Sequence, residues 1–177
     1  MSSWRHPDTT PHTVSRAALL GVCAFAAVCL GFHAFSEQAW VPLLDSFNLA
    51  LHEAGHPLVG LFSDRLMVYG GTLFQIVFPL ALARHFQRRE HAVGVAVAWV
   101  WLGENLLNVA RYAADARAQM LPLVGGGEHD WTEILSRWGL LASDLRLAGL
   151  LRVVATLVMV GACVWLWRRW RDDLASG

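Results

Sequence analysis

The chain of 177 residues contains no lysine, few cysteines and little charge. All fourteen basic side chains are arginine and fourteen side chains are acidic, so the formal net charge is zero. A neutral chain gives no electrostatic reason to expect a nucleic-acid partner. Cys23, Cys29 and Cys163 have neither the spacing of zinc ligands nor that of a disulfide framework, and each lies in an apolar run. We interpret them as small residues buried in a membrane.

Apolar sequence is what the chain has in excess. Hydrophobic residues make up 55% of it and charged residues 16%, which is unusual for a soluble domain. Five apolar stretches cover residues 17–35, 43–62, 66–83, 91–110 and 147–167. The first is uncharged and long enough to cross a bilayer. A signal peptide cleaved near Ser36 is the competing interpretation, but the length of the stretch favours a retained helix.

This pattern predicts an all-α, polytopic membrane protein with four to five membrane segments and membrane lipid as a partner. The length favours one embedded domain over residues 17–177, preceded by a flexible N-terminus at residues 1–16. Residues 112–146 form a polar loop between the last two stretches. Within it, the segment from Trp131 to Asp144 has the pattern of an amphipathic helix that lies in the membrane interface.

The second stretch carries the motif His52-Glu53-Ala54-Gly55-His56, an instance of H-E-x-x-H. On a helix the two histidines share one face, so both imidazoles can bind one zinc ion. Zinc lowers the pKa of a bound water to about 7, and Glu53 is close enough to take its proton. Such a short motif also arises by chance, but charged groups inside an apolar span are costly and usually functional. The motif therefore predicts a zinc site on a helix.

A polar stripe near the end of the fourth stretch supplies candidates for the surroundings of the zinc. Glu104, Asn108, Arg111 and Asp115 follow helical spacing. The stripe either satisfies its own hydrogen bonds at the membrane boundary, or orients the zinc ligands and holds substrate. Tyr112 or Arg111 is expected to steady an oxyanion. Further polar residues expected around the cavity, as hydrogen-bond partners rather than ligands, are Asp45, Asn48, Gln75 and Asn105.

The third zinc ligand is expected after the triple glycine at residues 125–127. Glycines permit a tight backbone path, which brings Glu128, His129 and Asp130 together as candidates. Asp130 also fits the N-cap of a helix, with Glu133 completing a capping box. That capping role favours His129 as the ligand and Asp130 as the group that orients it, but the choice between them stays open.

The arginines predict an orientation. The clusters at residues 84–89 and 168–171 are separated by two crossings, so the positive-inside rule places both in the cytoplasm. One crossing separates His56 from the first cluster, and one separates that cluster from the polar loop. Both halves of the site therefore share the opposite face, which is periplasmic in a bacterial inner membrane. Arg5 and Arg16 join the cytoplasmic clusters only if segment 43–62 does not fully cross; otherwise the N-terminus lies outside.

These features together resemble the site-2-protease-like intramembrane zinc metallopeptidases. The resemblance covers roughly residues 45–135: HEAGH in an apolar segment, a glycine-opened stretch after it, and a late acidic residue after Leu121-Pro122-Leu123. In that family two histidines and a later aspartate bind zinc, and the motif glutamate activates water. The resemblance implies a peptidase with Zn²⁺ as cofactor, a membrane-protein or peptide substrate, and Asp130 as a ligand.

The chain departs from the family in two respects. Its aspartate stands in His129-Asp130-Trp131 rather than in a Leu-Asp-Gly context, and the combination of HEAGH with GGG-x-HDW looks more like a group of compact bacterial membrane proteins. Members of the family usually open their site towards the cytoplasm, whereas the arginines point to the other face. Two alternatives therefore remain: a zinc hydrolase of a lipid amide or ester, and a non-enzymatic membrane protein whose metal is structural.

Overall fold

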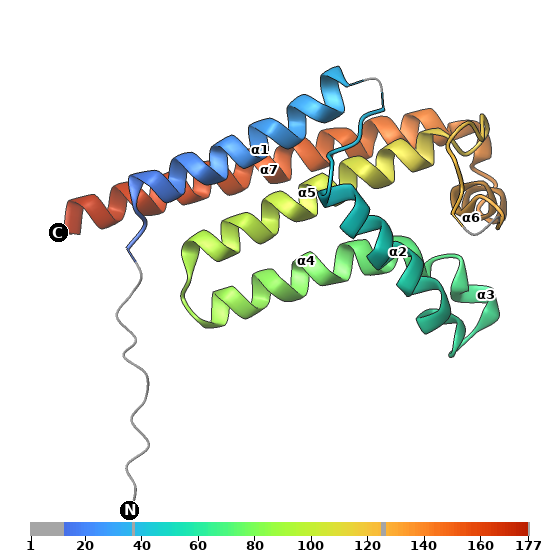
Figure 1. Ribbon diagram of the computed structural model, residues 1–177, viewed down its shortest axis with the longest axis horizontal. Coiled ribbons are helices and arrows are strands. Elements are labelled where there is room, and N and C mark those ends of the chain that lie inside the picture. The colour runs from blue at the N-terminus through green and yellow to red at the C-terminus, as the bar shows by residue number, and fades with distance from the viewer. Residues whose placement is uncertain (1–12, 37, 125–126, 177) are drawn as a thin grey trace, which may run out of the picture.

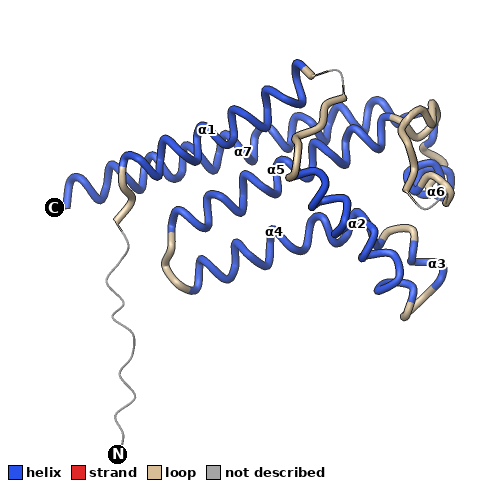
Figure 2. Tube along the Cα trace, in the orientation of Figure 1, coloured by secondary structure: helices blue, strands red, loops and turns tan. Residues whose placement is uncertain are grey.

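The computed structural model describes residues 13–36, 38–124 and 127–176, and these residues form helices without any strand (Figures 1 and 2). The predicted all-α class is confirmed for them. The helices are α1 (Arg16–Phe35), α2 (Leu44–Gly60), α3 (Asp64–Met67), α4 (Gly70–Arg88), α5 (Ala92–Ala114), α6 (Asp130–Arg137) and α7 (Asp144–Ser176). A 3₁₀ turn at Leu141–Ser143 leads into α7.

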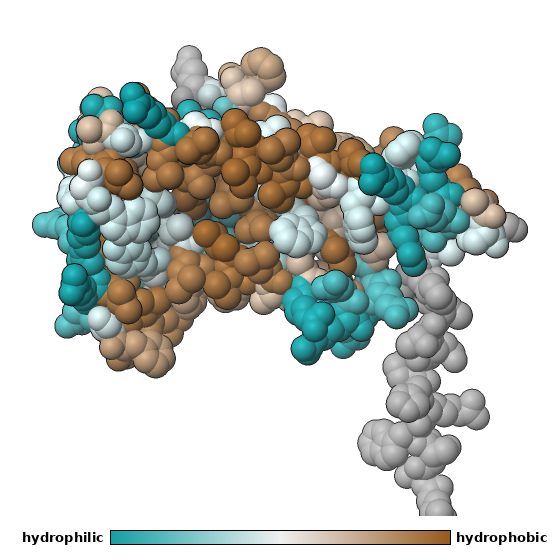
Figure 3. All heavy atoms as spheres, turned by 180° about the vertical axis from the view of Figure 1, so that it is seen from behind, coloured by the Kyte–Doolittle hydropathy of each residue, from teal (hydrophilic) through white to brown (hydrophobic). Residues whose placement is uncertain are grey.

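Three of these helices, α1, α5 and α7, are long and apolar enough to cross a membrane. Within the described residues, α2 and α4 do not meet the same criteria of length and apolarity. Most of α1 and α7 is unburied although it is apolar, as expected of helices that face lipid. Figure 3 shows an apolar band over the middle of the molecule with polar surface towards its two ends. The chain therefore has the surface of a membrane protein.

Helix α5 is the centre of the bundle, with α4, α7 and α1 packed around it (Figure 1). Small residues allow α5 and α7 to approach each other closely. A Cβ atom added to Gly103 would lie 2.3 Å from Cγ of Met159 and 2.9 Å from the carbonyl oxygen of Ala155. The core around this contact includes the fully buried Cys29, which agrees with a buried, unreactive cysteine.

The two ends of the bundle differ in composition. Figure 1 shows the start of α1, the turn between α4 and α5 and the end of α7 at one end, and α3 and α6 at the other. The backbone N–H of Val14 donates to Asp173 Oδ2 at 2.7 Å, which ties the start of α1 to the end of α7. Arg16 and the clusters at residues 84–89 and 168–171 therefore share one end. Of the N-terminus predicted to be flexible, residues 1–12 lie outside the described residues, whereas Val14 to Arg16 are held.

Three predicted segments differ in extent from the helices of the structure. The third apolar stretch, residues 66–83, is broken: α3 ends at Met67 and α4 begins at Gly70, where the backbone of α4 meets that of α2. The amphipathic helix expected from Trp131 to Asp144 ends at Arg137, since Gly139 adopts a left-handed conformation with φ of 67°. Helix α7 then begins earlier and ends later than the predicted 147–167.

Candidate metal centre

His52 and His56 lie one turn apart on α2, and their ring centroids are 4.9 Å apart. The Nδ1 atom of each ring has a partner. That of His52 is 3.0 Å from Gln75 Oε1, and that of His56 is 3.0 Å from the carbonyl oxygen of Met67. Outer contacts of this kind hold the imidazoles of metal ligands in place and leave Nε2 free to bind the metal. The sequence analysis named Gln75 as such a partner, but not the Met67 carbonyl.

Glycines make room for this arrangement. A Cβ atom at Gly71 would lie 2.4 Å from Nε2 of His52, so any side chain there would displace the imidazole. A Cβ atom at Gly55 would lie 2.2 Å from the carbonyl oxygen of Gly70, so α2 and α4 touch backbone to backbone. Gly55, in the middle of the HEAGH motif, therefore serves packing. It lets α2 pack directly on α4, the helix that carries Gln75, which orients His52.

Asp130 completes the cluster from the first residue of α6. Its Oδ2 atom lies 2.8 Å from Nε2 of His52 and 3.2 Å from Nε2 of His56. Its backbone N–H donates to the hydroxyl of Tyr112 at 3.2 Å, which fixes the start of α6 against α5. Burial acts to raise the pKa of Asp130, but the hydrogen bonds to the two histidines outweigh it, so the pKa lies below its ordinary value. Asp130 is therefore held as a carboxylate.

The hydrogen-bond geometry at His56 favours a proton or a metal ion between its ring and the carboxylate of Asp130. The Met67 carbonyl can only accept, so Nδ1 of His56 carries a hydrogen. In the neutral imidazole, Nε2 is then a lone pair, and it faces the carboxylate of Asp130. Two acceptors face each other stably only with a proton or a metal ion between them.

Two imidazoles and a carboxylate form a common ligand set of catalytic zinc. The three ligand atoms lie within 4.8 Å of one another. A tetrahedral zinc places two ligand atoms about 3.3–3.5 Å apart. The distances of Asp130 Oδ2 from Nε2 of His52, 2.8 Å, and from Nε2 of His56, 3.2 Å, are slightly shorter than this range.

His129 does not join the cluster, so the preference for it as the third ligand finds no support in the geometry. Its Nδ1 atom accepts from the backbone N–H of Thr132 at 3.3 Å, and its Nε2 atom lies 3.4 Å from Oδ2 of Asp115. Burial lowers its pKa, against the attraction of Asp115. The prediction that Asp130 is the N-cap is wrong, because His129 is the cap. Asp130, one residue inside the helix, is free to reach the histidines.

The histidine–aspartate cluster lines one open cavity, and its His52 also lines a second; both cavities include Glu53 and Tyr112 in their linings. The smaller, of about 380 Å³, carries further acidic side chains, among them Glu128 and Glu133. The larger, of about 670 Å³, is mostly apolar. Its lining includes Trp40, Leu49, Leu121, Leu123, Asn108 and Arg111. Space for substrate and water therefore lies next to the cluster.

No protein-family model, curated protein or solved structure matches this chain. The resemblance to the site-2-protease-like peptidases therefore stays a prediction. What the protein does has to be inferred from the chemistry of its own residues.

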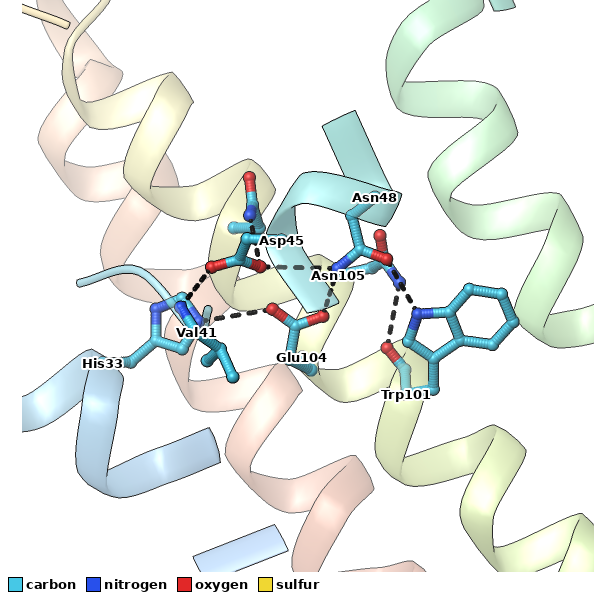
Figure 4. Close-up of polar contacts among 8 residues, drawn as sticks. His33, Val41, Asp45, Asn48, Trp101, Glu104 and Asn105 are labelled. Atoms are coloured by element: carbon cyan, nitrogen blue, oxygen red, sulfur yellow. Dashed lines mark hydrogen bonds and ion pairs between the residues drawn. The ribbon is translucent and has the colours of Figure 1, made fainter. Parts of the chain in front are cut away.

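The other polar residues that the sequence suggested for the surroundings of the zinc lie in different parts of the molecule. Arg111 and Tyr112 face the large cavity, as expected, and the guanidinium of Arg111 lies 5.7 Å from the ring centroid of Trp40. Of the polar stripe, Glu104 and Asn108 belong to a buried network at the start of α2 (Figure 4), while Asp115 accepts from the backbone N–H groups of Met120 and Leu121. The members of that network are His33, Asp45, Asn48, Trp101, Glu104, Asn105 and Asn108. The sequence analysis missed His33, although it is the one histidine in the first apolar stretch.

Proposed function

We propose that the protein is a membrane-embedded zinc hydrolase with His52, His56 and Asp130 as zinc ligands and Glu53 as the general base. The observation that carries the proposal is the convergence of two imidazole nitrogens and one carboxylate oxygen at the wall of an open cavity that Glu53 also lines. Within the described residues the cluster has three ligands rather than four. A position left for water is typical of a catalytic zinc site, whereas a structural one is closed.

The chain's own residues support each part of a hydrolytic reaction. Zinc, when bound, supplies a Lewis acid for the scissile carbonyl and lowers the pKa of water. Glu53 lines both cavities, from where it takes the proton of the attacking water and returns it to the leaving group. The hydroxyl of Tyr112 accepts from the Asp130 backbone, so its own proton remains to stabilise an oxyanion. Gln75 and the Met67 carbonyl keep the imidazoles aligned.

A peptide bond in a membrane protein or peptide is the proposed target. An amide or ester bond of a lipid is the second candidate, and the lining of the larger cavity favours it. Trp40, Leu49 and Leu121 there provide an apolar wall for an acyl chain, and Arg111 provides a cation for an anionic head group.

The proposed setting is the bacterial inner membrane, with four crossing helices, α1, α4, α5 and α7. Helix α2 then does not cross. In support, α2 begins beside the middle of α5, where Asn48 bonds to Glu104 at 2.5 Å, and it ends near α3 at the end where the site lies (Figure 1). All arginine clusters are then at the cytoplasmic end and the zinc site opens towards the periplasm.

Substitution of Glu53 tests the enzymatic proposal. Glu53→Gln should keep the fold and the zinc but lower the rate of hydrolysis by about 10²–10⁴-fold, since only the base is removed. The activity of purified protein is measured on a peptide and on a lipid amide or ester, and its zinc by elemental analysis. Glu90→Gln, in the turn at the far end, is the matched control and should be fully active. A Glu53→Gln protein as active as the unaltered one would exclude Glu53 as the base.

Cysteine labelling in intact cells tests the orientation. In a background without Cys23, Cys29 and Cys163, a cysteine at Gly127 should react with an impermeant thiol reagent and one at Gln87 should not. Both positions are exposed in the fold, so accessibility alone does not separate them. The opposite pattern would reverse the orientation, and labelling of both from one side would contradict the four crossings.

A further inference from the structure

A second histidine–carboxylate cluster lies where the start of α2 meets α1 and the middle of α5 (Figure 4). His33 comes from the last turn of α1, Asp45 from the first turn of α2 and Glu104 from α5. One ligand atom from each lies within 4.8 Å of the others. Asp45 and Glu104 are completely buried, and the side chain of His33 is 8% exposed.

The two carboxylates are held in different ways. Asp45 is surrounded by donors: the backbone N–H of Val41 at 2.6 Å, the amide of Asn108 at 2.8 Å and that of Asn48 at 3.4 Å. Glu104 receives one hydrogen bond, through Oε2, from the amide of Asn48. Trp101 donates to the other end of that amide, at Oδ1, which fixes its orientation. Asp45 is thus stabilised as an anion, while half of the Glu104 carboxylate is unused.

The Oε1 atom of Glu104, which has no hydrogen-bond partner in the described part of the chain, points at a ring nitrogen that also has none. Among the described residues, Oε1 of Glu104 and Nε2 of His33 have no hydrogen-bond partner although both atoms are buried. They lie 3.5 Å apart, which is long for a hydrogen bond. It matches the separation of about 3.3–3.5 Å between two ligand atoms on one tetrahedral metal ion. Buried polar atoms are rarely left unpartnered, so the pair calls for a third body between them.

The negative charges of the two carboxylates also favour a third body between them. Two carboxylates this close, both removed from water, repel each other strongly unless a proton or a cation compensates them. A divalent cation between Asp45 and Glu104 makes the group neutral, which is the state that a low-dielectric interior favours. It also gives Oε1 of Glu104 and Nε2 of His33 the partner that each one lacks.

We propose that His33, Asp45 and Glu104 bind a second divalent cation, distinct from the zinc of the histidine–aspartate cluster. An imidazole in the ligand set favours a transition metal such as Zn²⁺ or Mn²⁺ over Ca²⁺ and Mg²⁺, which prefer oxygen alone. Neither of the two cavities includes His33, Asp45 or Glu104 in its lining, so the ion is structural. It joins α1, α2 and α5 at the point from which α2 leads to the HEAGH motif.

Metal content tests the proposal with the full chain. Purified protein is stripped with a chelator, reloaded with ZnCl₂ or MnCl₂ and passed through a desalting column, and the bound metal per chain is measured. The double variant His52→Ala/His56→Ala, which lacks the first site, should still bind about one equivalent, and its melting temperature should rise on reloading. Adding Glu104→Gln to that double variant should abolish both the binding and the rise.

Two further variants keep the test decisive. Glu90→Gln, an exposed glutamate in the turn between α4 and α5, is the matched control and should leave metal content unchanged. His33→Gln, at the end of α1, should lower the affinity for metal at least about tenfold even if Glu104→Gln does not fold. The proposal is overturned if the double variant binds no metal, or if Glu104→Gln and His33→Gln both bind as much as their parent. Unchanged hydrolysis in the His52→Ala/His56→Ala variant would contradict only the proposed enzyme, whereas absence of metal from that variant would contradict only this second ion.

Discussion

Helix α2 carries two sites built from the same chemical groups, about two turns apart. At His52 an imidazole meets the carboxylate of Asp130 beside two cavities, whereas at Asp45 a carboxylate meets Glu104 with no exposure at all. The first cluster is closed by a residue that follows a loop, the second by residues of two long helices. Composition alone therefore does not separate a reactive site from a structural one. What distinguishes the two clusters is access to water and substrate.

Removal of metal should produce the largest difference between the two clusters. Brief treatment with a chelator should take about one equivalent from the open cluster and lower hydrolysis roughly 10³-fold or more, because Lewis acid catalysis contributes several kcal/mol. The ion at Glu104 should leave more slowly, since no cavity reaches it. Metal content and activity are followed together over time, and added ZnCl₂ should restore the activity. Full activity after one equivalent has left would contradict a catalytic role.

Exchange of the third ligand should have the next largest effect. Asp130→Asn should lower zinc affinity at least about 100-fold, since it removes a charged ligand atom rather than an outer contact. His129→Ala should leave zinc bound and cost about 1 kcal/mol of stability through the loss of a helix cap. Zinc titration and thermal unfolding of the two proteins separate these outcomes. If His129→Ala loses the metal and Asp130→Asn retains it, the assignment of the ligands is reversed.

A methyl group behind His52 should have the smallest effect of the three. Gly71→Ala places a Cβ atom into the imidazole and should destabilise the protein by about 1–3 kcal/mol, with weaker zinc binding. Gly149→Ala is the control, because a Cβ atom there meets nothing within 4 Å. It should be neutral or stabilising by up to about 1 kcal/mol. Thermal unfolding of both variants checks this, and equal melting temperatures would show that His52 can move freely.

The parts predicted well from the sequence are those governed by local periodicity. The limits of α1 and α5, the shared face of His52 and His56, and the meeting of the motif with the loop around Asp130 all follow from spacing and from counting apolar stretches. The break between Met67 and Gly70 was missed although Gly70 and Gly71 interrupt the apolar run there; the close approach of α4 to α2 at Gly55 is a tertiary contact that the sequence does not give.

The preference for His129 over Asp130 as the third ligand finds no support in the geometry, for a different reason. Capping preferences place aspartate at the N-cap, and histidine is not a favoured cap. Here a tertiary contact decides: the Tyr112 hydroxyl holds the N–H of Asp130, and the cap falls one residue earlier. For Glu104 and Asn108 the sequence left two interpretations open, self-satisfied hydrogen bonds and a place around the zinc ligands; the structure pairs them with Asn48 and Asp45. Periodicity gives the face of a helix but not the neighbour it meets.

The contact between Gly55 and Gly70 has a consequence for motion. Where two helices touch through side chains, rotamer changes let the contact adjust when one helix shifts against the other. Where backbone meets backbone, no such adjustment exists, and α2 can shift on α4 only by separating from it. His52 and Gln75 belong to these two helices, so thermal motion carries them together and preserves the hydrogen bond between them. The imidazole should then keep its direction even when the surrounding bilayer thins or thickens and the outer helices tilt.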